Sequence, residues 1–131
     1  MLVLDASALV VLLAGPDRLS ARWYGRLSED ELHAPHLIDA ELGNVLRRLA
    51  RRQEISADLA ELLLGLGMVL VDTRHDHGPL AVVAWSMRHN LTFYDALYVA
   101  LAAALDAPLV TTDARLASAP GLPCAVELLE G

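Results

Sequence analysis

Four acidic residues lie beside apolar runs at well-separated points of the chain, where carboxylates are seldom placed without a partner. They are Asp5, Glu41, Asp95 and Asp113. Gathered in one crevice, four carboxylates would repel one another and would not all ionise unaided. A divalent cation would relieve that repulsion, and ligation by oxygen alone suits Mg²⁺ or Mn²⁺. Such cations promote the hydrolysis of phosphodiester bonds by activating water and stabilising charge on the phosphate.

Two of these acids also have a purely structural interpretation. Thr92 and Asp95 fit a capping box, with Thr92 as the N-cap and Asp95 in the first helical turn. Asp113 could cap the helical segment that follows it. Both interpretations stay open for each acid taken alone, so the question is whether the four acids converge on one place.

The elements that must position these acids alternate between helical and strand-like segments. The clearest is a helix over 92–106, which carries no charge from Ala96 to Leu105 and is therefore predicted to be buried. Other helices are predicted over 6–14, 17–27, 36–53, 56–66 and 80–89, with another opened by Asp113. Strands are predicted over 1–4, 32–34, 68–71, 109–111 and 125–129, with a loop over 73–79.

This alternation predicts an α/β fold in which helices cover both faces of a mostly parallel sheet. Residues 1–131 suit a single domain. Ligands bind such sheets beyond the carboxyl ends of the strands, at the point where the strand order switches. Asp5 and Asp113 each follow a strand, so their carboxylates should meet there if the two strands are neighbours.

Composition limits the class of protein. No uncharged stretch reaches roughly 18 residues, so no transmembrane helix is expected. The first apolar run has no basic segment before it, so no secretory signal is expected. Cys124 is the single cysteine and cannot form an internal disulfide. The cytoplasm is therefore the expected compartment.

Charge is unevenly distributed. The net charge of −7 argues against binding nucleic acid through general electrostatics, yet all ten basic residues are arginine. Arg18, Arg22 and Arg26 are spaced to form a stripe on one helix face, and a second cluster consists of Arg47, Arg48, Arg51 and Arg52. Each group could be a solvated helix face or a local phosphate contact, for which the planar guanidinium is well suited.

Four segments in order resemble the PIN-domain ribonucleases, in particular the VapC toxins of bacterial toxin–antitoxin pairs. The segments are DASALV (5–10), ELGNVL (41–46), NLTFYDALY (90–98) and TTDARL (111–116). The resemblance spans the whole chain. It implies a three-layer α/β/α sandwich and an Mg²⁺- or Mn²⁺-dependent endoribonuclease that leaves a 5′-phosphate and a 3′-hydroxyl. It also implies an antitoxin partner of the VapB type.

The resemblance further assigns roles to residues. It implies catalytic and metal-binding roles for Asp5, Glu41, Asp95 and Asp113. Supporting hydrogen bonds would come from Ser7, Asn44, Thr111 and Thr112. Some relatives carry one more acid shortly after the last aspartate, where this chain has Ala114 and Arg115. A second metal would then be held loosely or would need a substrate phosphate.

Other classes of protein fit the sequence less well. A response-regulator receiver domain needs a lysine, which the chain lacks, and a haloacid-dehalogenase-type phosphatase needs an aspartate where Ser7 stands. A histidine-driven ribonuclease would also usually need a lysine. A PIN nuclease of RNA maturation and a non-catalytic PIN-like binding module remain the alternatives, and a short open reading frame just upstream would indicate the toxin.

Several remaining residues have plainer interpretations. His75-Asp76-His77 is expected to be a surface loop rather than a metal site. His33 and His36 are expected to be structural. Aromatic anchors of the core or of an interface are expected at Trp23, Tyr24 and Trp85. The leucines at 62–64 and 66 exceed what one helix face can bury, so they are expected either in the core or at a homodimer or antitoxin interface.

Overall fold

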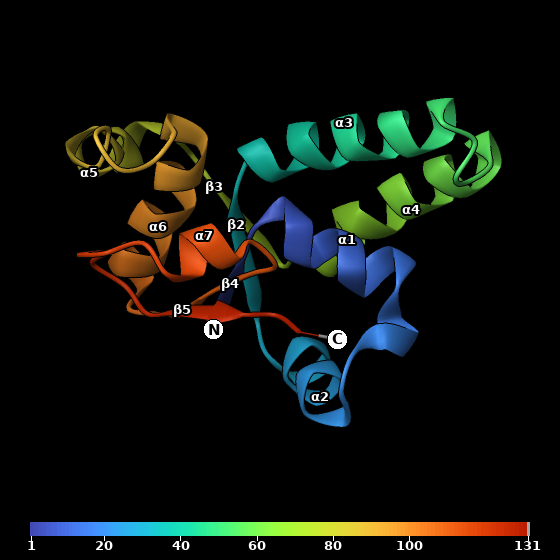
Figure 1. The fold of residues 1–131 in the computed structure, drawn as a ribbon, viewed down its shortest axis with the longest axis horizontal. Helices are drawn as coiled ribbons and strands as arrows, with labels where there is room; N and C mark the ends of the chain where they lie inside the picture. The colour runs from blue at the N-terminus through green and yellow to red at the C-terminus, as the bar shows by residue number, and fades with distance from the viewer. Residues whose placement is uncertain (131) are drawn as a thin grey trace.

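The computed structural model describes residues 1–130, which form a parallel sheet between layers of helices (Figure 1). The strands are β1 (Leu2–Leu4), β2 (Leu32–Pro35), β3 (Thr73–His75), β4 (Leu109–Thr111) and β5 (Val126–Leu128). The helices are α1 (Ala6–Ala14), α2 (Ala21–Glu29), α3 (Leu37–Arg51), α4 (Ala57–Leu70), α5 (Ala81–Ser86), α6 (Phe93–Leu105) and α7 (Ala114–Ala117), with short 3₁₀ turns at Pro16–Arg18 and Gly78–Leu80.

The five strands run in the order β3-β2-β1-β4-β5, and each neighbouring pair is parallel. Figure 1 shows α5 and α6 to the left of the strands and α1, α3 and α4 to the right. Side chains alternate along β1: Leu2 and Leu4 join a buried cluster with Trp23 of α2, whereas Val3 joins the cluster built around α6. The predicted α/β/α sandwich with a parallel sheet is confirmed.

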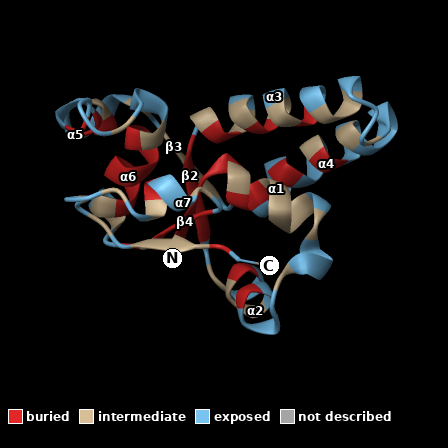
Figure 2. Cartoon of the chain, in the orientation of Figure 1, coloured by how far each residue is buried: buried red, intermediate tan, exposed pale blue. Residues whose placement is uncertain are grey.

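The uncharged segment forms the central helix, α6. It begins at its N-cap Thr92, whose hydroxyl accepts a hydrogen bond from the backbone N–H of Asp95 at 3.1 Å. Every residue from Ala96 to Ala102 is buried, and Figure 2 shows the middle of this helix in red. The helix ends at Asp106, which adopts the left-handed conformation with φ 50°. The predicted burial of this helix is therefore confirmed.

The predicted strand at 68–71 is wrong, because α4 continues through Leu70. Short apolar runs do not distinguish a strand from a buried helix. Here packing decides: the buried Gly67 lies so close to Leu42 of α3 that a Cβ atom would come within 2.4 Å of Leu42 Cδ2. The strand lies instead in the predicted loop, where Thr73–His75 pairs with 33–35 of β2. Its residues are polar and partly exposed, so the sequence carried no strand signal.

The predicted helix over 17–27 is also wrong at its start. Pro16–Arg18 forms a 3₁₀ turn, and Ser20 then caps α2 by accepting from the N–H of Trp23 at 3.2 Å. Arg18 therefore does not share a helix with Arg22, and the predicted arginine stripe does not form. The predicted helix over 80–89 is shortened to α5. No helix of residues 1–130 is long and apolar enough to cross a membrane.

Candidate active site

The site lies where the strand order switches direction along the chain. β1 lies between β2 and β4, with Leu4 in register with Val110. Asp5 and Asp113 follow the carboxyl ends of β1 and β4, and the N–H of Asp5 donates to the Val110 carbonyl at 3.2 Å. The two strands are thus neighbours, as required for their following carboxylates to meet.

One pocket of about 280 Å³ at this edge of the sheet contains all four predicted acids. Asp5 enters from the β1–α1 junction, Glu41 from α3, Asp95 from the first turn of α6 and Asp113 from the β4–α7 junction. The remaining lining residues are Ala6, Ser7, Asn44, Val45, Arg48 and Tyr98. Segments separated by more than a hundred residues therefore present their carboxylates to one space.

Asp5 is buried, and three donors hold its carboxylate. Ser7 Oγ donates to Oδ1 at 2.5 Å, the N–H of Ala8 donates to Oδ1 at 3.0 Å, and the Thr111 hydroxyl donates to Oδ2. Burial raises the pKa of Asp5 above its ordinary value, the donors oppose that rise, and the charge of Asp113 adds to it. Asp5 also caps α1 through the Ala8 contact, so this carboxylate is both structural and part of the pocket.

A short polar network fixes the β4–α7 junction. The N–H of Thr112 donates to Ser7 Oγ, and the N–H of Asp113 donates to Thr111 Oγ1, both at 3.0 Å. Asp113 Oδ1 accepts from the N–H of Arg115 at 2.9 Å and caps α7. Of the predicted supporting residues, Ser7 and Thr111 bond Asp5 directly, whereas Thr112 takes part through its backbone.

Glu41 is held by a residue whose role the sequence did not predict. The hydroxyl of Tyr98 donates to Glu41 Oε1 at 2.6 Å, although the Tyr98 side chain is only 1% exposed. Burial raises the pKa of Glu41, and the charges of Asp95 and Asp5 raise it further, while the Tyr98 hydrogen bond opposes both. The pKa of Tyr98 is itself raised by burial and by the Glu41 bond. The available signal was that this hydroxyl is the single polar side-chain atom of an otherwise apolar helical run.

The backbone N–H of Asp95 takes part in the N-cap of α6, and the Asp95 side chain lines the pocket. The bond to Thr92 uses the N–H of Asp95. Burial raises the pKa of the Asp95 carboxyl, the charges of Asp5 and Asp113 raise it further, and a side-chain hydrogen bond with Thr92 opposes the rise. The contacts with Thr92 therefore account for the backbone and for part of the surroundings of the carboxyl, while burial beside Asp5 and Asp113 still leaves its pKa raised.

The donor chemistry of the pocket fits a hydrated divalent cation. No three His, Cys, Asp or Glu side chains within residues 1–130 converge tightly enough to form a metal site as they stand. Carboxylates that raise one another's pKa are expected to stay apart when no cation separates them. Mg²⁺ keeps several waters and binds through one or two carboxylates, so it does not require a closed protein cage. The residues thus fit an open, oxygen-lined site.

Three histidines make structural contacts in the described part of the chain. His33 Nδ1 and His75 Nε2 share a hydrogen bond of 2.9 Å, and His33 Nε2 lies 2.7 Å from Glu31 Oε1. His77 Nε2 accepts from the N–H of Leu37 at the start of α3. His75 belongs to β3 and not to a loop, which corrects the prediction for that residue.

The predicted anchors and arginines divide between core and surface. Trp23 is buried, whereas Tyr24 and Trp85 are 53% and 60% exposed. Of the leucine run, Leu63 is buried and Leu62 is exposed. A second pocket, of about 430 Å³, is lined by Arg47, Arg48, Arg51 and Arg52, and Arg48 lines the acidic pocket as well.

Comparison with known proteins agrees with this geometry. The family model of the PIN domain matches residues 2–122. Ribonuclease VapC1 of Mycobacterium tuberculosis is 51% identical over 97% of this chain and 96% of its own length. VapC ribonuclease Mb0985 of Mycobacterium bovis is 38% identical over 98% of both chains.

Solved structures share the fold. The crystal structure of PAE2754 from Pyrobaculum aerophilum superposes with a TM-score of 0.72 at 28% identity, covering 95% of this chain and 81% of that one. The structure of VapBC2 from Rickettsia felis, bound to a DNA fragment from its promoter, superposes with a TM-score of 0.70 at 14% identity, covering 98% of each chain.

Proposed function

The chain belongs to the PIN-domain family, among its VapC-type ribonucleases, and we propose that its acidic pocket hydrolyses RNA with a bound divalent cation. The observation that carries this proposal is the convergence of Asp5, Glu41, Asp95 and Asp113 on one pocket at the carboxyl ends of β1 and β4. The relatives named ribonucleases supply the reaction class, and the oxygen-only donors favour Mg²⁺ or Mn²⁺.

The chain's own residues would orient the cation and the substrate. Three donors fix Asp5, and the Tyr98 hydroxyl fixes Glu41, so neither carboxylate has to be ordered when a ligand binds. Asp95 and Asp113 complete the donor set. A cation held there would lower the pKa of a coordinated water and offset charge on the phosphate. Arg48 lines the same pocket and would supply a positive charge for the phosphate.

The experiment combines product analysis with metal binding. Purified protein should cut RNA in Mg²⁺ or Mn²⁺, stop in excess chelator, and leave 5′-phosphate and 3′-hydroxyl ends. Asp95→Asn should lose both cleavage and calorimetric Mn²⁺ binding, with its circular dichroism unchanged. Asp58→Asn is the matched control, because Asp58 is an exposed acid in the first turn of α4, away from the pocket. Cleavage that persists in chelator, or that ends in a 2′,3′-cyclic phosphate, would contradict the proposal.

The protein is further proposed to act as the toxin of a VapBC pair, as a homodimer restrained by a VapB-type antitoxin. Large apolar side chains are exposed on two helices, including Leu62 and Val69 on α4 and Val82 and Trp85 on α5. Such surfaces mark protein interfaces when they are contiguous. The cytoplasm is the proposed compartment, because cellular RNA and the antitoxin are met there.

Capture from the native host should recover a small antitoxin, and sedimentation of the purified chain should give a dimer. Expression without that antitoxin should arrest growth. A monomer that is recovered alone and is harmless on overexpression would refute the toxin assignment while leaving the nuclease chemistry to its own test.

A further inference from the structure

The C-terminal half of α3 carries an uncompensated positive patch on a protein whose net charge is −7. Arg47, Arg48, Arg51 and Arg52 are all exposed, and together they line the pocket of about 430 Å³. Within residues 1–130, none of these four guanidinium groups has a carboxylate oxygen within 4.0 Å. Arg26 and Arg74, in contrast, are paired with Glu127 and Asp39 at 2.8 and 2.7 Å.

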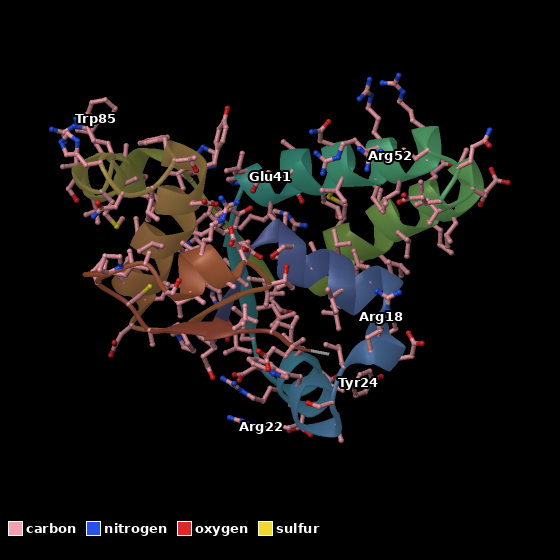
Figure 3. The ribbon with its side chains drawn as sticks, viewed as in Figure 1. Arg18, Arg22, Tyr24, Glu41, Arg52 and Trp85 are labelled. Carbon is pink, nitrogen blue, oxygen red and sulfur yellow. The ribbon has the colours of Figure 1, made fainter. Side chains whose placement is uncertain are left out.

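The patch, which we call the α3 arginine patch, is continuous with the acidic pocket. Arg48 lines both pockets and is therefore the residue at which they meet. Helical periodicity places Arg48 and Arg52, seven and eleven residues after Glu41, within about 20° of Glu41 around the helix axis. Arg52 is the C-cap directly after α3, so these three residues form a row of about 16 Å along the helix and its end. Figure 3 shows Glu41 near the start of α3 and Arg52 further along towards its other end.

We propose that the α3 arginine patch is the binding track for the phosphates of a single RNA strand on one side of the bond that is cut. The inference rests on the proposed nuclease function, because the acidic pocket fixes the position of the cut phosphate. Arg48 holds the phosphate nearest that position. Arg47, Arg51 and Arg52 hold phosphates further along the strand.

The chemistry favours an RNA backbone over other anionic partners. Guanidinium groups bind phosphate bidentately, and here they repeat along a line that begins at the hydrolytic pocket. The arginines from Arg47 to Arg52 span about 7.5 Å of the helix, which matches about two nucleotides of a stacked strand at about 3.4 Å each. The protein is acidic overall and repels a polyanion. The α3 arginine patch therefore sets the direction from which an RNA strand approaches the pocket.

The expected effect is a change in the salt dependence of RNA binding. Each phosphate neutralised on a single strand contributes about −0.7 to the slope of log affinity against log salt. Arg51→Ala/Arg52→Ala should therefore make that slope shallower by about 1.4. Arg51→Lys/Arg52→Lys keeps both charges and should retain most of the slope, which separates a charge effect from a folding defect.

The assay is fluorescence anisotropy of a labelled oligouridine of about 15 nucleotides, from roughly 50 to 200 mM KCl, with Ca²⁺ replacing Mg²⁺ to limit hydrolysis. The matched control is Arg18→Ala/Arg22→Ala, which removes the same charge from two exposed arginines. Figure 3 shows Arg22 on α2, at the opposite end of the view from Arg52. This control should leave the slope unchanged.

Equal slopes for the two alanine double variants would overturn the track. So would an Arg51→Ala/Arg52→Ala protein that binds RNA normally but no longer captures the antitoxin, because the patch would then serve an acidic protein segment. Failure of the nuclease proposal would give a different result. The parent protein would then bind RNA with the arginine-dependent slope but would not cut it in Mg²⁺.

Discussion

Replacing Tyr98 with phenylalanine removes one oxygen atom from the buried helix and tests how the fold supports the site. The lost interaction is the 2.6 Å hydrogen bond to Glu41 Oε1. A hydrogen bond to a charged group contributes about 1.5–3 kcal/mol to stability. Glu41 is partly exposed and can accept from water instead, so we expect the low end of that range, about 1.5 kcal/mol.

The expected shift in melting temperature follows from the size of the chain. Unfolding entropy near the midpoint is about 2.1 cal/mol/K per residue, or about 0.28 kcal/mol/K over the 131 residues. A loss of about 1.5 kcal/mol therefore lowers the melting temperature by about 5 °C. Tyr24→Phe is the matched control, because the Tyr24 side chain is 53% exposed on α2, and it should melt within about 1 °C of the parent.

The same substitution should change the pH dependence of cleavage. The Tyr98 hydroxyl lowers the pKa of Glu41, against burial and the neighbouring acids that raise it. Without that donor the pKa of Glu41 rises further, so the ionised carboxylate is present only at higher pH. The acid limb of the pH–rate profile of Tyr98→Phe should move to higher pH, and activity should recover on the alkaline side.

The reasoning is refuted by either of two results. If Tyr98→Phe melts like the parent, the hydroxyl does not stabilise the fold. If it melts lower but keeps the parental acid limb, Tyr98 supports the core alone and does not tune Glu41. The Tyr24→Phe profile shows how much movement the assay produces without any change at the site.

Two further predictions concern stability. Without metal at pH 7, Asp95→Asn should melt above the parent, because it removes a carboxyl whose folded pKa is raised and keeps the backbone hydrogen bond to Thr92. The stability of the parent should rise as pH falls from 7 through that raised pKa. The difference in melting temperature between the two proteins should therefore vanish near the unfolded pKa of about 3.9. Mg²⁺ should then stabilise the parent far more than the variant, and a variant that melts lower at pH 7 would mark Asp95 as structural. Gly65→Ala should stabilise α4 by up to about 1 kcal/mol because a Cβ there meets no atom within 4 Å. Gly67→Ala should instead destabilise the protein, by up to about 2 kcal/mol, because its Cβ would lie 2.4 Å from Leu42 Cδ2; equal melting shifts for the two variants would contradict this packing argument.

The sequence predicted the parts of the fold that local apolarity controls. β1, β4 and α6 are apolar and buried, and all three were predicted near their observed bounds. The errors fall where packing or pairing overrides local pattern. β3 is polar and forms because residues 33–35 of β2 pair with it, whereas residues 68–70 are exposed and form the last turn of α4, which approaches α3 at Gly67. Neither outcome follows from a single stretch read alone.

The same division applies to the site. The acids were predictable because a carboxylate beside an apolar run can be recognised from the local sequence alone. The Tyr98–Glu41 bond joins residues 57 positions apart and depends on how α3 and α6 are placed around the sheet. The meeting of two pockets at Arg48 likewise needs the helix in three dimensions. The sequence identified the arginine cluster but not its continuity with the acids.

Helix capping and metal binding, which the sequence left as alternative roles for these acids, are compatible in the structure. Asp5 is the N-cap of α1, and Asp95 lies in the first turn of α6, so both carboxylates stand at the amino ends of helices of 9 and 13 residues. An amino end carries partial positive charge and free N–H groups, which stabilise a nearby anion. The pocket can therefore gather acids that repel one another because each helix start offsets part of the repulsion before any cation binds. A residue that caps a helix here is for the same reason well placed to act as an anionic ligand, so a structural role at such a position is no argument against a catalytic one.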